Sequence, residues 1–206
     1  MEGAHELAAA PRAGLRNIAD RESRDGEEHE LGRHAPHLMR IPSRAALFTA
    51  FVSGQAAGLV MLAVAMVLAM LRGRSPLHPL QVFTALIMGE TTLQKVSWSS
   101  VLPGFIAHQA GPTIVWSKVF GGVVGLSLRS FSAKRALILG ALVGALALFV
   151  DGYLLMPGIQ RQLNGRNLWA QNVPLWVAWV THLVFGISLG FFYWRWQPRR
   201  SGGQDL

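Results

Sequence analysis

One uncharged segment limits what this chain can fold into. Between Arg44 and Arg72 lie 27 residues, 45–71, without a single charged side chain. As a helix, this segment extends about 40 Å, which exceeds the roughly 30 Å hydrocarbon core of a bilayer. It lies too far along the chain, and is too long, to be the apolar region of a cleavable signal peptide. The segment therefore predicts a membrane-spanning helix.

Three further apolar segments follow, and the composition agrees with a membrane protein. The chain of 206 residues is 51% hydrophobic and 15% charged, against about 25% charged residues in an ordinary soluble domain. Backbone groups in lipid must be paired within the segment, so helices are the simplest structure. We therefore predict an all-α polytopic fold with a transmembrane domain, 46–196. Its four transmembrane helices are expected at about 46–71, 101–128, 136–156 and 174–194.

Charge is distributed unevenly along the chain. Residues 1–45 carry a net charge of −1, whereas residues 46–206 carry +9. The basic residues flank the apolar segments, where they are expected to meet lipid headgroups, so we do not expect nucleic-acid binding. Residues 1–45 contain few large apolar side chains and are expected to form a charged cytoplasmic extension, mobile unless a partner binds it. The absence of cysteine excludes thiolate metal sites and cysteine nucleophiles.

The basic residues near the ends of the predicted spans indicate an orientation. Nine lie on one side and five on the other, so the positive-inside rule places both termini, including the tail 197–206, in the cytoplasm. The larger group contains Arg33, Arg40, Arg44, Arg129, Lys134, Arg135, Arg195, Arg199 and Arg200, and the smaller contains Arg72, Arg74, Lys95, Arg161 and Arg166.

The first predicted outer connection, 75–100, has helical periodicity of its own. Leu80, Phe83 and Ile87 recur at helical spacing, with polar residues such as Gln81 between them. This pattern predicts a short amphipathic helix in the membrane interface. Tryptophans near the span ends are expected to anchor the protein at the interface. They are Trp98, Trp169, Trp176, Trp194 and Trp196.

Each apolar segment carries one pair of glycines four residues apart. Residues at this spacing share one face of a helix, where glycine lets a neighbouring backbone approach closely. The sequence therefore predicts a tightly packed bundle, which the connections divide into two successive hairpins. The pairs are Gly54 and Gly58, Gly121 and Gly125, Gly140 and Gly144, and Gly186 and Gly190.

Short motifs in these segments carry a family resemblance. They are the sequence GQAAGL at 54–59, the pair Gly140 and Gly144, and the sequence HLVFGISLGFFY at 182–193. Over roughly 46–194 the chain resembles small bacterial inner-membrane proteins of the YagU type. The resemblance implies a four-helix membrane fold in the bacterial inner membrane and implies no activity.

Four ionisable side chains are expected at membrane depth, where such groups are costly and are candidates for function. His108 and His182 both lie about 12 Å from the outer ends of their helices, and Asp151 lies near the outer end of its own. If these three converge, Asp151 can accept a hydrogen bond from an imidazole N–H. The set is interpreted as a polar clamp between helices, a proton or ion pathway, or a pair of haem or metal ligands. Lys118 is expected to extend to the cytoplasmic headgroups or to contact Gln55.

Two apparent catalytic motifs do not fit their chemistry. The GxSxG sequence at 186–190 lies inside a predicted helix, whereas a nucleophile elbow needs a strand-to-helix turn. The sequence from His29 to His34 is one residue too long for the zinc motif HExxH. No phosphate-binding or dinucleotide-binding loop occurs, so we expect no enzyme, no catalytic residue and no metal site.

The leading functional hypothesis is a non-catalytic integral subunit or accessory component of a larger membrane complex, whose other subunits order the N-terminal extension. The first alternative is a small oligomeric transporter or channel whose path is lined by His108, Asp151 and His182, with Lys118 as a further candidate. The second alternative is a redox subunit in which His108 and His182 bind haem b or a metal. No cofactor is required by the sequence itself.

Overall fold

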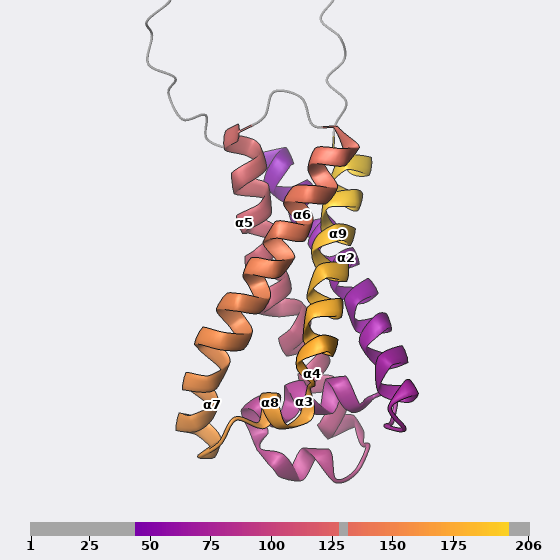
Figure 1. The fold of residues 1–206 in the computed structure, drawn as a ribbon, viewed down its shortest axis with the longest axis vertical. Coiled ribbons are helices and arrows are strands. Elements are labelled where there is room, and N and C mark those ends of the chain that lie inside the picture. The colour runs from indigo at the N-terminus through magenta and orange to yellow at the C-terminus, as the bar shows by residue number, and fades with distance from the viewer. Residues whose placement is uncertain (1–43, 128–131, 198–206) are drawn as a thin grey trace, which may run out of the picture. The chain divides into compact units, whose positions relative to one another are not determined.

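The computed structural model describes residues 44–127 and 132–197, and within them every regular element is helical (Figure 1). All but the last two residues of the predicted extension, and all but the first residue of the predicted C-terminal tail, lie outside these ranges. In chain order the elements are α2 (Arg44–Leu71), α3 (His78–Met88), the 3₁₀-helix η1 (Glu90–Leu93), α4 (Trp98–Ala110), α5 (Pro112–Ser127), α6 (Ala133–Ala147), the π-helix η2 (Leu148–Leu155), α7 (Met156–Asn164), α8 (Leu168–Asn172) and α9 (Leu175–Trp196).

Three helical segments are long and apolar enough to cross a membrane. They are α2, the continuous α6–η2–α7 segment Ala133–Asn164, and α9. The all-α class and the membrane-like character predicted from the sequence are therefore confirmed. The predicted span 101–128 is divided between α4 and α5, and neither half alone has the length of a crossing.

The division between α4 and α5 follows from the dipeptide Gly111-Pro112. A residue before proline is disfavoured in the α-region, and Gly111 has ψ −102°, so α4 ends at Ala110. Pro112 has no N–H for the carbonyl of His108, four residues earlier. The hydroxyl of Thr113 donates to that carbonyl instead, at 2.8 Å, and so satisfies the group that the break leaves free.

The third span is longer than the sequence predicts. It was expected to end at Met156, before Pro157, but the helix continues as α7 to Asn164. Pro157 lies in the first turn of α7, directly after η2, so the helix continues through a residue that cannot donate a backbone hydrogen bond. The π-helix η2 precedes it, and the N–H of Met156 donates to Asp151, five residues earlier, as π-helical pairing requires.

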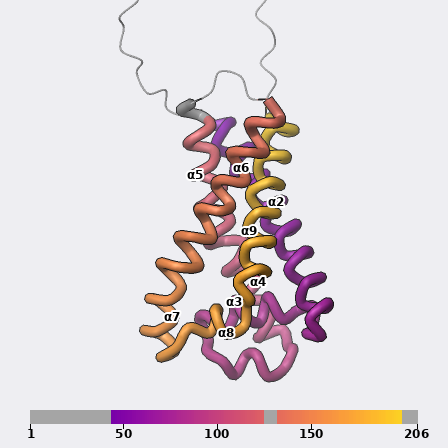
Figure 2. The backbone as a smooth tube through the Cα atoms, in the orientation of Figure 1, coloured from indigo at the N-terminus to yellow at the C-terminus, as the bar shows by residue number. Residues whose placement is uncertain are grey.

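The most extensive helix contact lies between α6 and α9, which run beside each other in Figures 1 and 2. A Cβ atom added at Gly140 would overlap the carbonyl of Gly186, and one added at Gly144 would overlap the carbonyl of His182. A Cβ atom at Gly190 would likewise overlap the backbone of α6. The two backbones therefore touch along a whole face, which side chains larger than hydrogen would separate.

A second small-residue contact joins α2 to α4 and α5. A Cβ atom at Gly54 would overlap Ser117, and one at Gly58 would lie 2.5 Å from Oε1 of Gln109. Gly121 faces Ala50 in the same way. The surroundings of Gly125 lie outside the described residues. Larger apolar side chains then fill the core beside these contacts: Trp116, Phe120, Val143, Phe185, Leu189 and Tyr193.

The two connections predicted on the outer side meet at one end of the bundle, where Figure 1 shows α3, α7 and α8. The buried amide of Gln160 in α7 donates to the carbonyl of Leu86 in α3, at 2.9 Å. Arg166 and Glu90 form an exposed ion pair between the same connections. These contacts join the two connections to each other at this end of the bundle.

The helix predicted in the first connection is present as α3, but two of its polar residues face inward together with Leu80. Gln81 and Thr84 are buried, whereas Ile87 is 62% exposed. The reason is the close approach of α4: a Cβ atom at Gly104 would overlap the carbonyl of Leu80. A polar side chain beside this contact needs a hydrogen-bond partner within the protein. The Gln81 side chain has one, because it donates to the backbone carbonyl of Thr92 at 3.0 Å.

The α6–α9 contact yields a stability prediction. Gly186→Ala places a methyl group against the backbone of α6, so we expect the free energy of unfolding to fall by about 1–3 kcal/mol. Gly122→Ala is the matched control, because a Cβ atom there meets nothing within 4 Å. Equilibrium unfolding in mixed detergent micelles measures both variants. Equal stability of the two would contradict the proposed backbone contact.

Candidate functional site

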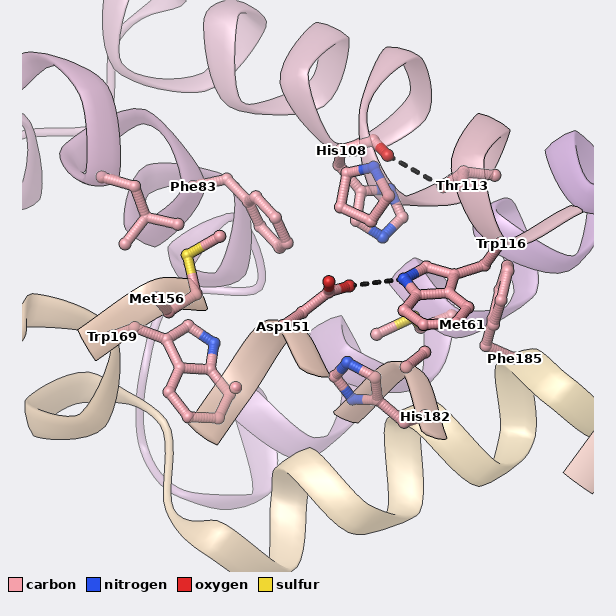
Figure 3. Close-up of a pocket in the computed structure, with 14 residues that line it drawn as sticks. Met61, Phe83, His108, Thr113, Trp116, Asp151, Met156, Trp169, His182 and Phe185 are labelled. Carbon is pink, nitrogen blue, oxygen red and sulfur yellow. Dashed lines mark hydrogen bonds between the residues drawn. The ribbon is translucent and has the colours of Figure 1, made fainter. Parts of the chain in front are cut away.

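A cavity of about 50 Å³ lies inside the bundle at the level of the α4–α5 break. This volume holds a few water molecules. Figure 3 shows that His108, Asp151 and His182, whose convergence the sequence leaves open, all line it, from α4, η2 and α9 respectively. The other lining residues are Met61, Phe83, Leu86, Pro112, Thr113, Trp116, Ala147, Gly152, Met156, Trp169 and Phe185.

Asp151 is held by a tryptophan and not by a histidine. Its Oδ2 accepts a hydrogen bond from the indole N–H of Trp116 at 2.7 Å. The imidazole donor that the sequence suggested is therefore replaced by a residue that the sequence analysis did not consider. An available signal was Trp116 itself, because an indole N–H inside a predicted span needs an acceptor.

His108 is the last ionisable group before the break in α4, and its side chain is 3% exposed. Its Nδ1 lies 3.1 Å from Oε1 of Gln109, and its ring meets that of Phe83 edge to face at 5.0 Å. Its backbone carbonyl is the one that Thr113 satisfies. The break therefore fixes both the depth and the orientation of this imidazole.

His182 lies half-buried on α9 across the cavity. Its Nδ1 lies 2.8 Å from the carbonyl of Ala178, an acceptor, so Nδ1 carries the proton in the neutral ring. This hydrogen bond fixes the tautomer and leaves Nε2 as an acceptor. In the described part of the chain, Nε2 has no partner of its own.

A second cavity of about 70 Å³ adjoins the first, and Phe83, Trp169 and the two histidines line both. Its other polar lining residues include Arg72, His78 and Asn172, near the end of the bundle. Burial, and then the positive charges of Arg74 and Arg72, lower the pKa of His78. His78 is therefore neutral at pH 7, and arginine supplies the charge in this second cavity.

Lys118 does not join the cluster. It is exposed on the outer face of α5, and it lines neither cavity. Gln55, its possible partner, instead exchanges two hydrogen bonds with Gln109, each 3.3 Å long. The side chains of Gln55 and Gln109 each donate to the backbone carbonyl of the other, which ties α2 to the last turn of α4.

The predicted interface tryptophans separate into two kinds. Trp98 is 84% exposed, and Trp176, Trp194 and Trp196 also keep much of their surface exposed, as anchors require. Trp169 instead turns into the bundle, lines both cavities and lies against Gly152. It therefore belongs to the candidate site.

The donors around the cavity do not form a metal centre. In the described ranges no three His, Asp or Glu side chains lie where they could hold one metal ion. The arrangement offers a carboxyl group, two imidazoles and aromatic walls around space for water. Such a set can take up and pass on a proton or bind a small polar ligand.

The Trp116–Asp151 hydrogen bond can be tested by removing its donor alone. Trp116→Phe keeps an aromatic ring but removes the indole N–H, so we expect a loss of roughly 1 kcal/mol in the free energy of unfolding. The same change in an Asp151→Ala background should cost clearly less, because the acceptor is absent. Trp98→Phe, at an exposed position, serves as the control. Additive losses in the double variant would contradict this pairing.

Comparisons with known protein families, with curated proteins and with solved structures find no match to this chain. The resemblance to proteins of the YagU type therefore stays a prediction.

Proposed function

We propose that α4 and α5 together form a fourth crossing, so that the chain spans the membrane as two hairpins with both termini in the cytoplasm. The proposal rests on the meeting of α3, α7 and α8 at one end of the bundle, since both predicted outer connections belong there. At the Gly111 break, the carbonyls of His108 and Gln109 accept hydrogen bonds from Thr113 and Gln55, and irregular structure at membrane depth is tolerated where its backbone groups are paired within the protein. The bacterial inner membrane follows from the family resemblance.

We further propose that the protein is a small membrane transporter or channel whose path for protons contains Asp151, His108 and His182. One observation carries this proposal: Asp151, the only acidic residue between Glu90 and Asp205, faces an internal cavity shared with two histidines. A charged group inside a bilayer is costly, and placing it against water and imidazoles lowers that cost. A polar group needed only for packing would be expected to have all its hydrogen bonds satisfied.

The backbone around Asp151 supports the same conclusion. A π-helix has weaker pairing than an α-helix and is found preferentially at functional sites. Here η2 begins three residues before Asp151, and α4 breaks three residues after His108. Discontinuous helices beside polar side chains near mid-membrane are a common design of transport sites.

The two other functional hypotheses remain predictions with direct tests. A non-catalytic subunit would copurify with its partners from native membranes in mild detergent. A haem bound by both histidines would give a Soret absorption band in the purified protein. The transport proposal is favoured over both because it accounts for a cavity that brings Asp151 together with two histidines.

Proton flux into liposomes tests the proposed path. With a pH-sensitive dye inside the vesicles and an imposed membrane potential, the reconstituted protein should acidify the interior. Asp151→Asn should reduce the flux at least about tenfold, a change equivalent to roughly 1.4 kcal/mol. Lys118→Gln should leave it unchanged, because this ionisable residue of α5 lies outside both cavities. Equal flux through the parent protein and Asp151→Asn would reject the proposal.

A further inference from the structure

The carboxyl group of Asp151 lacks a counter-charge. Oδ2 accepts from Trp116, and Oδ1 has no hydrogen-bond partner among the residues that the structure describes. No basic side chain lines the first cavity apart from the two histidines, and the one ion pair within the described ranges joins Arg166 and Glu90 at the end of the bundle. An unpaired carboxylate in a membrane interior is costly, so a positively charged ligand would be stabilised there.

The two imidazoles add acceptors and no free donors. The Nδ1 of His108 lies beside the Gln109 side-chain oxygen, and the Nδ1 of His182 lies beside a backbone carbonyl. In the neutral rings both Nε2 atoms are therefore acceptors. Among the described residues, Ser53 Oγ is the single enclosed side-chain polar atom without a partner, so both Nε2 atoms reach open space. This polarity suits a ligand that carries N–H donors.

The walls of the first cavity are aromatic. Figure 3 shows Phe83 and Trp169 on one side of the Asp151 carboxyl group and Trp116 on the other. The face of an aromatic ring attracts an ammonium group, most strongly for tryptophan and when water is excluded. Met61 and Met156 complete the lining with flexible apolar surface that adapts to a ligand's shape.

We infer that the first cavity binds a small alkylammonium ion, with Asp151 as its counter-ion, the two histidine Nε2 atoms as acceptors and Trp169 as an aromatic wall. A metal ion is the less suitable cation, because the described donors do not group as a metal site. Arg72 lines the second cavity and not the first. Its positive charge repels a cation, so the ligand's positive charge is expected beside Asp151. The inference rests on the proposed transport function and adds a ligand, an alkylammonium ion, to the cavity of the proton path.

Binding of propylammonium to the full chain in lipid nanodiscs tests the inference by calorimetry. Its neutral analogue 1-propanol has the same length and one polar end, and should bind at least about tenfold more weakly. Asp151→Asn should weaken propylammonium binding by a similar factor. Trp169→Leu should weaken it roughly two- to tenfold through loss of the ring face. Lys118→Gln is the matched control and should bind as the parent protein does.

Three results would overturn the inference: no binding of propylammonium, equal binding of 1-propanol, or undiminished binding by Asp151→Asn. If that variant fails to fold, Trp169→Leu and the comparison with 1-propanol decide the question. Failure of binding beside Asp151-dependent proton flux would remove the ligand class and leave the proposed path intact. Binding without flux in the parent protein would instead reject transport and keep the site.

Discussion

The contact between α6 and α9 is the constraint on which the rest of the arrangement depends. Gly140 and Gly144 lie against the backbone of Gly186 and His182, so the two helices touch without intervening side chains. Because η2 continues α6, this contact helps to bring Asp151 and His182 to the same cavity. A wider separation would move the carboxyl group away from the imidazole and open the cavity between them. Helix packing and the candidate site therefore depend on the same glycines.

Two departures from α-helical pairing then shape the site. Pro112 removes one backbone donor, which ends α4 and leaves a carbonyl that Thr113 satisfies. The π-helix changes the pairing around Asp151. One unbroken α-helix in place of α4 and α5, or α-helical pairing in place of η2, would turn the side chains of His108 and Asp151 in other directions. The polar lining is thus produced by irregular backbone inside a regular bundle, as is expected where a membrane protein handles polar groups.

Much of the fold follows from apolar runs and spacing, which act locally. The positions of α2 and α9 and the helix α3 were predicted from the sequence, whereas the convergence of His108, Asp151 and His182 was left as an open condition. Two boundaries were wrong for local reasons: Gly111-Pro112 broke an apolar run, and Pro157 was tolerated within a helix. The inward orientation of Gln81 was also missed, since it depends on α4 approaching α3 at Gly104.

The sequence by itself determined that the chain is helical and membrane-like, because uncharged runs longer than a bilayer leave few alternatives. It also determined which residues would be costly at membrane depth. Only the tertiary structure decided the surroundings of these side chains. Asp151 accepts from Trp116, Gln55 pairs with Gln109, and Lys118 is exposed on α5 without joining the cavity. Partner choice depends on how helices rotate against one another, and glycine contacts that admit no side chain fix that rotation. Periodicity within one helix carries no information about it.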